Sequence, residues 1–177
     1  QELTPAGEQG DEMIRKLADR LVAVDLLEQA AMLLDDQVRT RLKGVEKGEV
    51  GMNLAIIHAF DKRYKDMVSV LDSTRVAGLS ERTATRRRHL RAHALGNLNR
   101  VKEALLLLKG DRTVDADLVR AEMFWGNRDW PNAAQSLMSA IRGAGLKGGQ
   151  KLDDVEAVTI LNLATAYTLS NNEKALM

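Results

Sequence analysis

The sequence contains no cysteine, only two prolines, and aromatic residues at 3% of its 177 positions. The lack of cysteine excludes disulfides, thiolate catalysis and thiolate metal sites together. Scarce aromatics disfavour a sheet, because strands favour aromatic and β-branched side chains. The net charge of +1 gives no overall field that would recruit nucleic acid or an anionic membrane. The longest apolar runs, such as the four leucines at 105–108, are far too short to span a bilayer, and no signal peptide is visible.

Alanine and leucine are plentiful, and both favour helices that pack closely. Residues 1–10 are polar and contain Pro5 and two glycines, so we expect a flexible lead-in followed by one domain over 11–177. The chain begins at Gln1 and stops at Met177 inside a helical pattern, so we expect a piece of a longer protein. Its Ala, Leu and Arg usage is typical of a bacterial protein.

Apolar residues recur at helical spacing along most of the chain, which predicts an all-α fold. The segment KGVEKG at 43–48 reads as an interruption between two helices. Ser80 is expected to cap one helix, and Asp129 with Pro131 to begin another. We expect helices over about 11–24, 26–38, 49–60, 64–71, 80–95, 101–108, 113–125 and 130–141, and a last pair beginning at Asp153.

One stretch of the chain is repeated. The segment that starts at Arg91 matches the one that starts at Arg120 without a gap, 29 residues later. The same pattern of small and bulky residues occurs in five units. Each unit has a small or flexible residue near the start of its second helix. In the five units these residues are Ala30, Met67, Ala104, Ala133 and Ala175, separated by 37, 37, 29 and 42 residues. Periods in the mid-thirties predict stacked helix pairs, each completing its core against the next.

Leu163-Ala164-x-x-Tyr167, followed by Ala175, resembles the tetratricopeptide repeat (TPR) motif. The resemblance covers about 11–177, although Arg91 and Arg120 stand where the family has leucine. It implies a right-handed α-solenoid of antiparallel helix hairpins, with about four full hairpins and the start of a fifth. A generic helical-hairpin solenoid is the main rival, and a HEAT-like array is disfavoured because its period is longer.

In the TPR family the first helix of each pair lines a concave groove that binds a peptide or helix of a partner protein. The resemblance therefore implies a non-catalytic interaction scaffold. One first-helix residue, Trp125, is a candidate for this groove, although it could equally pack on the following unit. The alternative is a structural segment of a longer solenoid that stacks on further repeats or self-associates through uncapped ends. The groove residues expected from repeat position are Met52, Ile56, Arg86, His89, His93, Leu118, Glu122 and Trp125.

The basic segment 82–93 has three interpretations. Asp115, Asp117 and Glu122 each follow Arg86, Arg88 and His93 by 29 residues, so ion pairs between stacked repeats are favoured. An acidic partner is the second reading. Binding of acidic polymer or nucleic acid is the third and least favoured reading. The absence of aromatic residues among the arginines weakens it.

No residue set indicates catalysis, a cofactor or a metal. His89 and His93 have the i, i+4 spacing of a metal pair, but the neighbouring arginines would repel a cation. We interpret His58 as a buried, hydrogen-bonded histidine and Trp130 as a core residue. The glycines at 143–149 do not form a phosphate loop, because no strand precedes them and no Gly-Lys-Ser/Thr follows.

Overall fold

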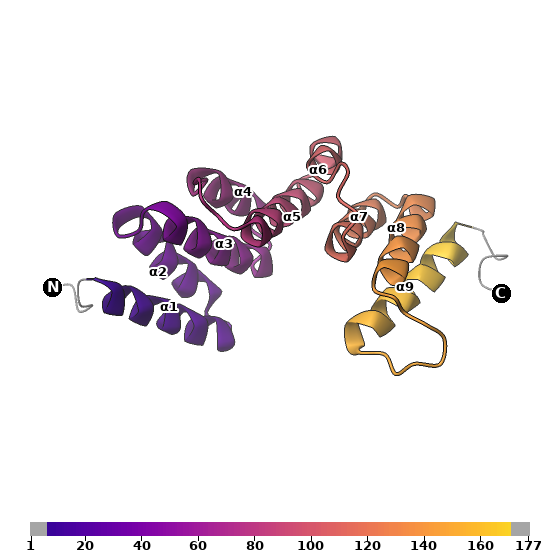
Figure 1. Ribbon diagram of the computed structural model, residues 1–177, viewed down its shortest axis with the longest axis horizontal. Coiled ribbons are helices and arrows are strands. Elements are labelled where there is room, and N and C mark those ends of the chain that lie inside the picture. The colour runs from indigo at the N-terminus through magenta and orange to yellow at the C-terminus, as the bar shows by residue number, and fades with distance from the viewer. Residues whose placement is uncertain (1–6, 171–177) are drawn as a thin grey trace. The chain divides into compact units, whose positions relative to one another are not determined.

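The computed structural model describes residues 7–170, and within this range the chain forms nine α-helices and no strand (Figure 1). The all-α prediction is confirmed. The chain divides into two compact units, Gln1–Leu98 and Asn99–Met177. The helices are α1 (Glu8–Ala23), α2 (Leu27–Thr40), α3 (Gly44–Phe60), α4 (Tyr64–Ser73), α5 (Glu81–Asn97), α6 (Val101–Leu107), α7 (Val114–Gly126), α8 (Trp130–Gly143) and α9 (Asp154–Leu169).

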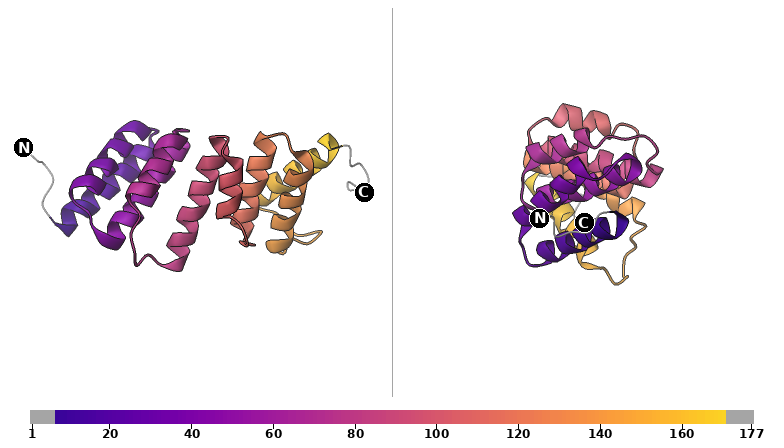
Figure 2. Two further views of the ribbon diagram at one scale, coloured as in Figure 1. Left: turned by 90° about the horizontal axis from the view of Figure 1, so that it is seen from above. Right: turned by 90° about the vertical axis from the view of Figure 1, so that its left-hand side faces the viewer.

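The first unit contains α1 to α5, and each of these helices packs on the next (Figure 2). Helix α3 also contacts α5. Leu54 and Met67 are fully buried in the core, together with the small residues Ala30 and Ala55. Small side chains at these positions let neighbouring helices approach closely, and the larger ones fill the remaining space.

In the second unit α7 packs on α8, and α8 packs on α9. The core contains Ala121, Ala134, Leu137, Leu163 and Ala166, with partly buried side chains such as Trp125 and Tyr167 packed against it. Ala175, which the sequence analysis placed in the last repeat, lies outside the described residues.

The turns after α1, α3, α5 and α7 share one backbone feature. Each contains a residue with a left-handed backbone: Asp25 (φ 61°), Lys62 (φ 56°), Asn99 (φ 61°) and Arg128 (φ 57°). Successive positions are separated by 37, 37 and 29 residues. These are the same steps that separate the repeated residues of the sequence.

The residue after the left-handed position makes a recurring hydrogen bond. Its N–H donates to the carbonyl oxygen five residues earlier, which satisfies a carbonyl that the helix end would leave without a partner. The bonds are Leu26 to Leu21 at 2.9 Å, Arg63 to His58 at 2.8 Å and Asp129 to Phe124 at 2.9 Å.

Side-chain caps begin several helices where the sequence placed them. The Ser80 hydroxyl accepts a hydrogen bond from the backbone of Thr83, and Asp129 caps α8 with Pro131 in the first turn. Asp153 and Glu156 form a reciprocal capping box at the start of α9. Each cap satisfies backbone N–H groups that have no partner within the helix.

The predicted interruption at 43–48 is wrong, because α3 begins at Gly44 and continues through Gly48 and Gly51. These glycines serve packing. A Cβ at Gly48 would lie 2.7 Å from Val76 Cγ2, and a Cβ at Gly51 would lie 2.6 Å from the Thr74 Cβ. Glycine stands here because the segment after α4 passes close to the α3 backbone.

Candidate functional site

The basic segment 82–93 is divided between buried and exposed side chains. Arg87 is only 8% exposed. Its Nη2 donates to the carbonyl oxygens of Leu71 at 2.8 Å and Thr74 at 3.1 Å and to the Thr74 hydroxyl at 2.9 Å, and its Nη1 donates to the Gly48 carbonyl oxygen. Burial lowers the pKa of Arg87, and Asp72 opposes this shift. An arginine stays charged even so, and here the charge faces the negative end of the α4 dipole.

Arg120 likewise binds backbone carbonyl oxygens, in this case just after the end of α6. Its Nη2 donates to the carbonyl oxygens of Leu108 at 2.6 Å and Asp111 at 2.5 Å. Arg87 and Arg120 are each the seventh residue of their helix. The sequence alignment had instead matched Arg120 with Arg91, which forms an ion pair with Asp72 on α4.

The remaining residues of the segment differ in exposure. Arg82, Arg86 and Arg88 are exposed on α5, whereas His89 is only 7% exposed. The His93 ring meets the Tyr64 ring edge to face, with centroids 5.6 Å apart. Within residues 7–170 no three histidine, aspartate or glutamate side chains gather as a metal site would require.

The other predicted groove residues of the first unit are Met52 and Ile56, which lie one turn apart on α3 and are half-buried. Asp117, expected to pair across repeats, is bound within its own helix by Arg120 at 2.5 Å.

Three predicted residues come together in the second unit. Leu118, Glu122 and Trp125 of α7 line one cleft of about 270 Å³. Its other lining residues are Ala121, Leu137, Thr159 and Asn162, from α7, α8 and α9. Repeat spacing identified the α7 residues, but nothing in the sequence singled out those of α8 and α9.

The chemistry of this cleft is mainly apolar. Leu118, Leu137 and the Trp125 ring form its apolar walls, and Trp125 is held edge to face against Trp130 with ring centroids 5.3 Å apart. The Thr159 hydroxyl already donates to the Val155 carbonyl oxygen in its own helix, at 2.8 Å. The side-chain amide of Asn162 is the other neutral polar group in the lining that could bind a ligand. Glu122 is the one charged side chain in the lining of this cleft, which suits an apolar side chain with a basic neighbour.

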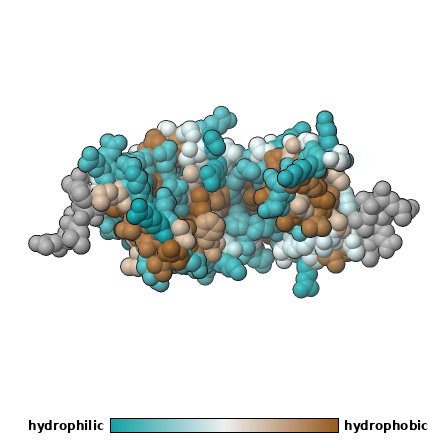
Figure 3. All heavy atoms as spheres, turned by 90° about the horizontal axis from the view of Figure 1, so that it is seen from below, coloured by the Kyte–Doolittle hydropathy of each residue, from teal (hydrophilic) through white to brown (hydrophobic). Residues whose placement is uncertain are grey.

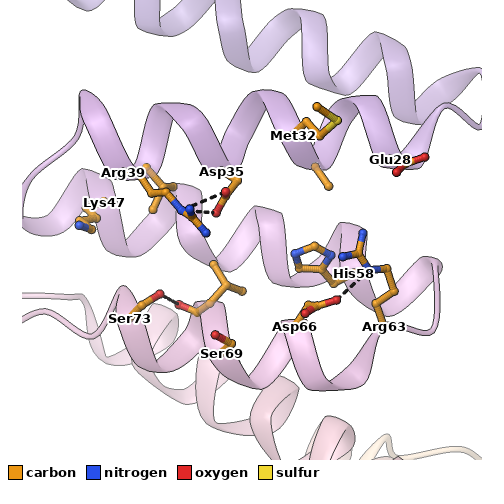
Figure 4. Close-up of a pocket in the computed structure, with 13 residues that line it drawn as sticks. Glu28, Met32, Asp35, Arg39, Lys47, His58, Arg63, Asp66, Ser69 and Ser73 are labelled. Atoms are coloured by element: carbon orange, nitrogen blue, oxygen red, sulfur yellow. Dashed lines mark hydrogen bonds and ion pairs between the residues drawn. The ribbon is translucent and has the colours of Figure 1, made fainter.

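A larger cleft of about 410 Å³ lies between α2 and α4 in the first unit, with His58 of α3 in its lining (Figure 4). His58 is buried, as predicted, but the expected hydrogen bond is absent, because Nδ1 has no partner among the described residues. Burial lowers the pKa of His58, and the Arg63 charge adds to this effect. The ring is therefore neutral at pH 7.

No helix within the described part of the chain is long and apolar enough to cross a membrane. Comparisons of the chain with protein-family models, with curated proteins and with solved structures found no match.

Proposed function

We propose that this protein is a TPR-like array of helix hairpins that binds another protein and performs no catalysis. Its second unit holds an apolar side chain of the partner, in a peptide or helix, in the cleft lined by α7, α8 and α9. Convergence of Leu118, Glu122 and Trp125 in one cleft carries this proposal, because repeat position alone selected all three.

The array interpretation rests on two features that recur with the repeat. The left-handed turn residues follow the sequence steps of 37, 37 and 29. The small or flexible residue of the second helix in each full unit is fully buried: Ala30, Met67, Ala104 and Ala133 all have 0% exposure. A common turn and a common close-packed position are what a repeated hairpin requires.

Selection from a random peptide library displayed on phage tests this function. We expect enriched peptides to carry a bulky apolar residue beside Lys or Arg, because Trp125 and Leu118 offer apolar surface and Glu122 offers a carboxylate. Glu122→Lys should weaken binding of a selected peptide roughly tenfold. Asp115→Lys, two turns earlier on the same helix, is the control and should leave binding unchanged. Equal effects of the two substitutions would contradict the site.

Exposed apolar side chains favour a second candidate, self-association. Leu17 of α1 is 49% exposed and Val24, directly after this helix, is 65% exposed; on α9, Val155 and Leu161 are both 66% exposed. On the face drawn in Figure 3, apolar side chains reach the surface among polar ones. Two different apolar faces would join copies through a heterologous contact, in which one copy uses the α1 face and the next copy uses the α9 face.

Sedimentation velocity over a range of protein concentrations tests this candidate. Self-association predicts that the mean sedimentation coefficient rises with concentration and that Leu161→Lys abolishes the rise. Leu106→Lys is the control, because Leu106 is 70% exposed on α6. A monomer at every concentration would rule self-association out.

A further inference from the structure

The cleft between α2 and α4 has ion pairs along its sides. On α2, Arg39 pairs with Asp35 at 3.0 Å. At the start of α4, the preceding residue Arg63 pairs with Asp66 at 2.7 Å. Because each pair neutralises itself, these four side chains leave the cleft without a dominant charge.

Four further polar groups line the cleft and make no hydrogen bond or ion pair with another described residue: Glu28, Lys47, Ser69 and Nδ1 of His58. A buried nitrogen without a partner is costly, since its desolvation is not offset by a hydrogen bond. His58 is 8% exposed and its ring faces the cleft, so a ligand that bonds to Nδ1 would remove this cost (Figure 4).

The two unpaired charges lie at opposite ends of the cleft, Lys47 beside Arg39 at one end and Glu28 at the other (Figure 4). His58 and Ser69 lie between these ends. On α2, Glu28 and Arg39 are three helical turns apart, roughly 16 Å at 1.5 Å per residue. A ligand that satisfies both ends must therefore carry opposite charges at about that separation.

The hydrogen-bonding groups of the cleft decide the form of such a ligand. A helix uses its backbone N–H groups within itself, so along most of its length it would offer no donor to His58 Nδ1. An extended chain is thinner and rises about 3.3 Å per residue, so its residues i and i+4 lie roughly 13 Å apart and point to the same side. The lengths of the two charged side chains cover the remaining distance. Its backbone also carries unpaired N–H and C=O groups along its whole length.

We propose that the cleft between α2 and α4 binds an extended peptide segment with an acidic side chain and, four residues away, a basic one. The acidic side chain lies against Lys47 and the basic one against Glu28. Between them the His58 ring, whose Nδ1 has almost no exposed surface in the free protein, turns slightly so that a backbone N–H of the peptide donates to Nδ1, and Ser69 bonds to the adjacent backbone. The neutral His58 ring has a lone pair available for this bond. The site is formed by other helices than the α7–α9 cleft and is independent of its function.

Titration of isotope-labelled protein with a defined peptide panel, followed by NMR, tests this proposal. The panel has one Asp and one Lys separated by one to six Ala or Ser residues, in both orders. We expect three intervening residues to bind most tightly, in one order only, and to shift the His58 imidazole resonances. Replacing either charged residue of the peptide by its neutral amide or by Ala should weaken binding up to fivefold.

The double variant Glu28→Lys/Lys47→Glu provides the decisive comparison, because both of its substitutions lie on the surface of the cleft and the total charge is unchanged. It should prefer the peptide of reversed order. His58→Leu should weaken binding of every peptide while the preferred order is kept. Affinity that ignores spacing and order, or no shift of cleft resonances at about 1 mM peptide, would overturn the proposal.

Discussion

Arg87 donates two hydrogen bonds to Thr74: its Nη2 lies 2.9 Å from the hydroxyl oxygen and 3.1 Å from the carbonyl oxygen. This contact joins α5 to the end of α4. Arg87→Met should therefore lower the free energy of unfolding by about 2–4 kcal/mol, because several buried carbonyl groups lose their partner. Arg87→Lys should recover only part of the loss, since an ammonium cannot reproduce the guanidinium fork. Urea unfolding followed by circular dichroism measures both.

The control for this prediction is Arg82→Met, at an exposed position on the same helix. It should change the free energy of unfolding by less than about 0.5 kcal/mol. Equal effects of Arg82→Met and Arg87→Met would show that the carbonyl contacts do not stabilise the fold.

Gly51→Ala tests the close approach of α3 to Thr74. Alanine favours a helix over glycine by about 1 kcal/mol. Even so, we expect a net loss of about 1–3 kcal/mol, because the new Cβ would lie 2.6 Å from the Thr74 Cβ. Gly126→Ala is the matched control, since a Cβ there meets nothing within 4 Å. Thermal unfolding should show opposite shifts of Tm for the two variants, and a higher Tm for both would refute the packing argument.

Lys62→Gly should stabilise the protein by about 0.5–1 kcal/mol. Lys62 has a φ of 56°, a conformation that glycine adopts without the steric cost of a side chain. Lys65→Gly, three residues later and inside α4, should lower stability by about 1 kcal/mol. Chemical denaturation of the two variants compares the same substitution with opposite expected signs. A loss of stability in Lys62→Gly would mean that the Lys62 side chain itself contributes.

His58 should make the stability of the protein depend on pH. Burial and Arg63 lower the pKa of His58 below 6.5, while Asp66, Asp35 and Asp61 oppose the shift. Between the folded and unfolded pKa values the unfolded chain binds more protons, so stability rises with pH and is lost on acidification. One histidine contributes a slope of at most about 1.4 kcal/mol per pH unit.

Urea unfolding at pH values from about 7 down to about 5 measures this slope in wild type and in His58→Leu. The difference between the two curves isolates His58 from the other titrating groups. It should grow as the pH falls below 6.5. Parallel curves would mean that the His58 ring is equally easy to protonate in the folded and unfolded chain.

Local chemistry made much of the fold predictable. Ser80 and Asp129 act on backbone groups within their own first turn, so their roles are readable from neighbouring residues. The segment at 43–48 was misread, because Gly48 is there to admit Val76 and Leu79, which lie far along the chain. Arg87 was missed for the same reason, since its partners come from α3 and α4.

The candidate sites were predictable to a different degree. Periodicity identified Leu118, Glu122 and Trp125, because they lie on one face of a single helix. Periodicity also placed His89 in the groove, although this side chain is buried. The cleft between α2 and α4 has no sequence signal, since its residues belong to three helices and share no spacing.

The turns and helix starts fix how this chain can change length. Ser80 and Thr113 cap the starts of α5 and α7 and lie 33 residues apart, whereas the left-handed residues after these helices, Asn99 and Arg128, lie 29 apart. Helix α5 is therefore four residues longer than α7, close to one turn of 3.6 residues. The extra turn leaves the start and the end of the helix in nearly the same rotational phase. Insertions or deletions of about four residues within such a helix are therefore the length changes that leave both the capped start and the left-handed turn at its end intact.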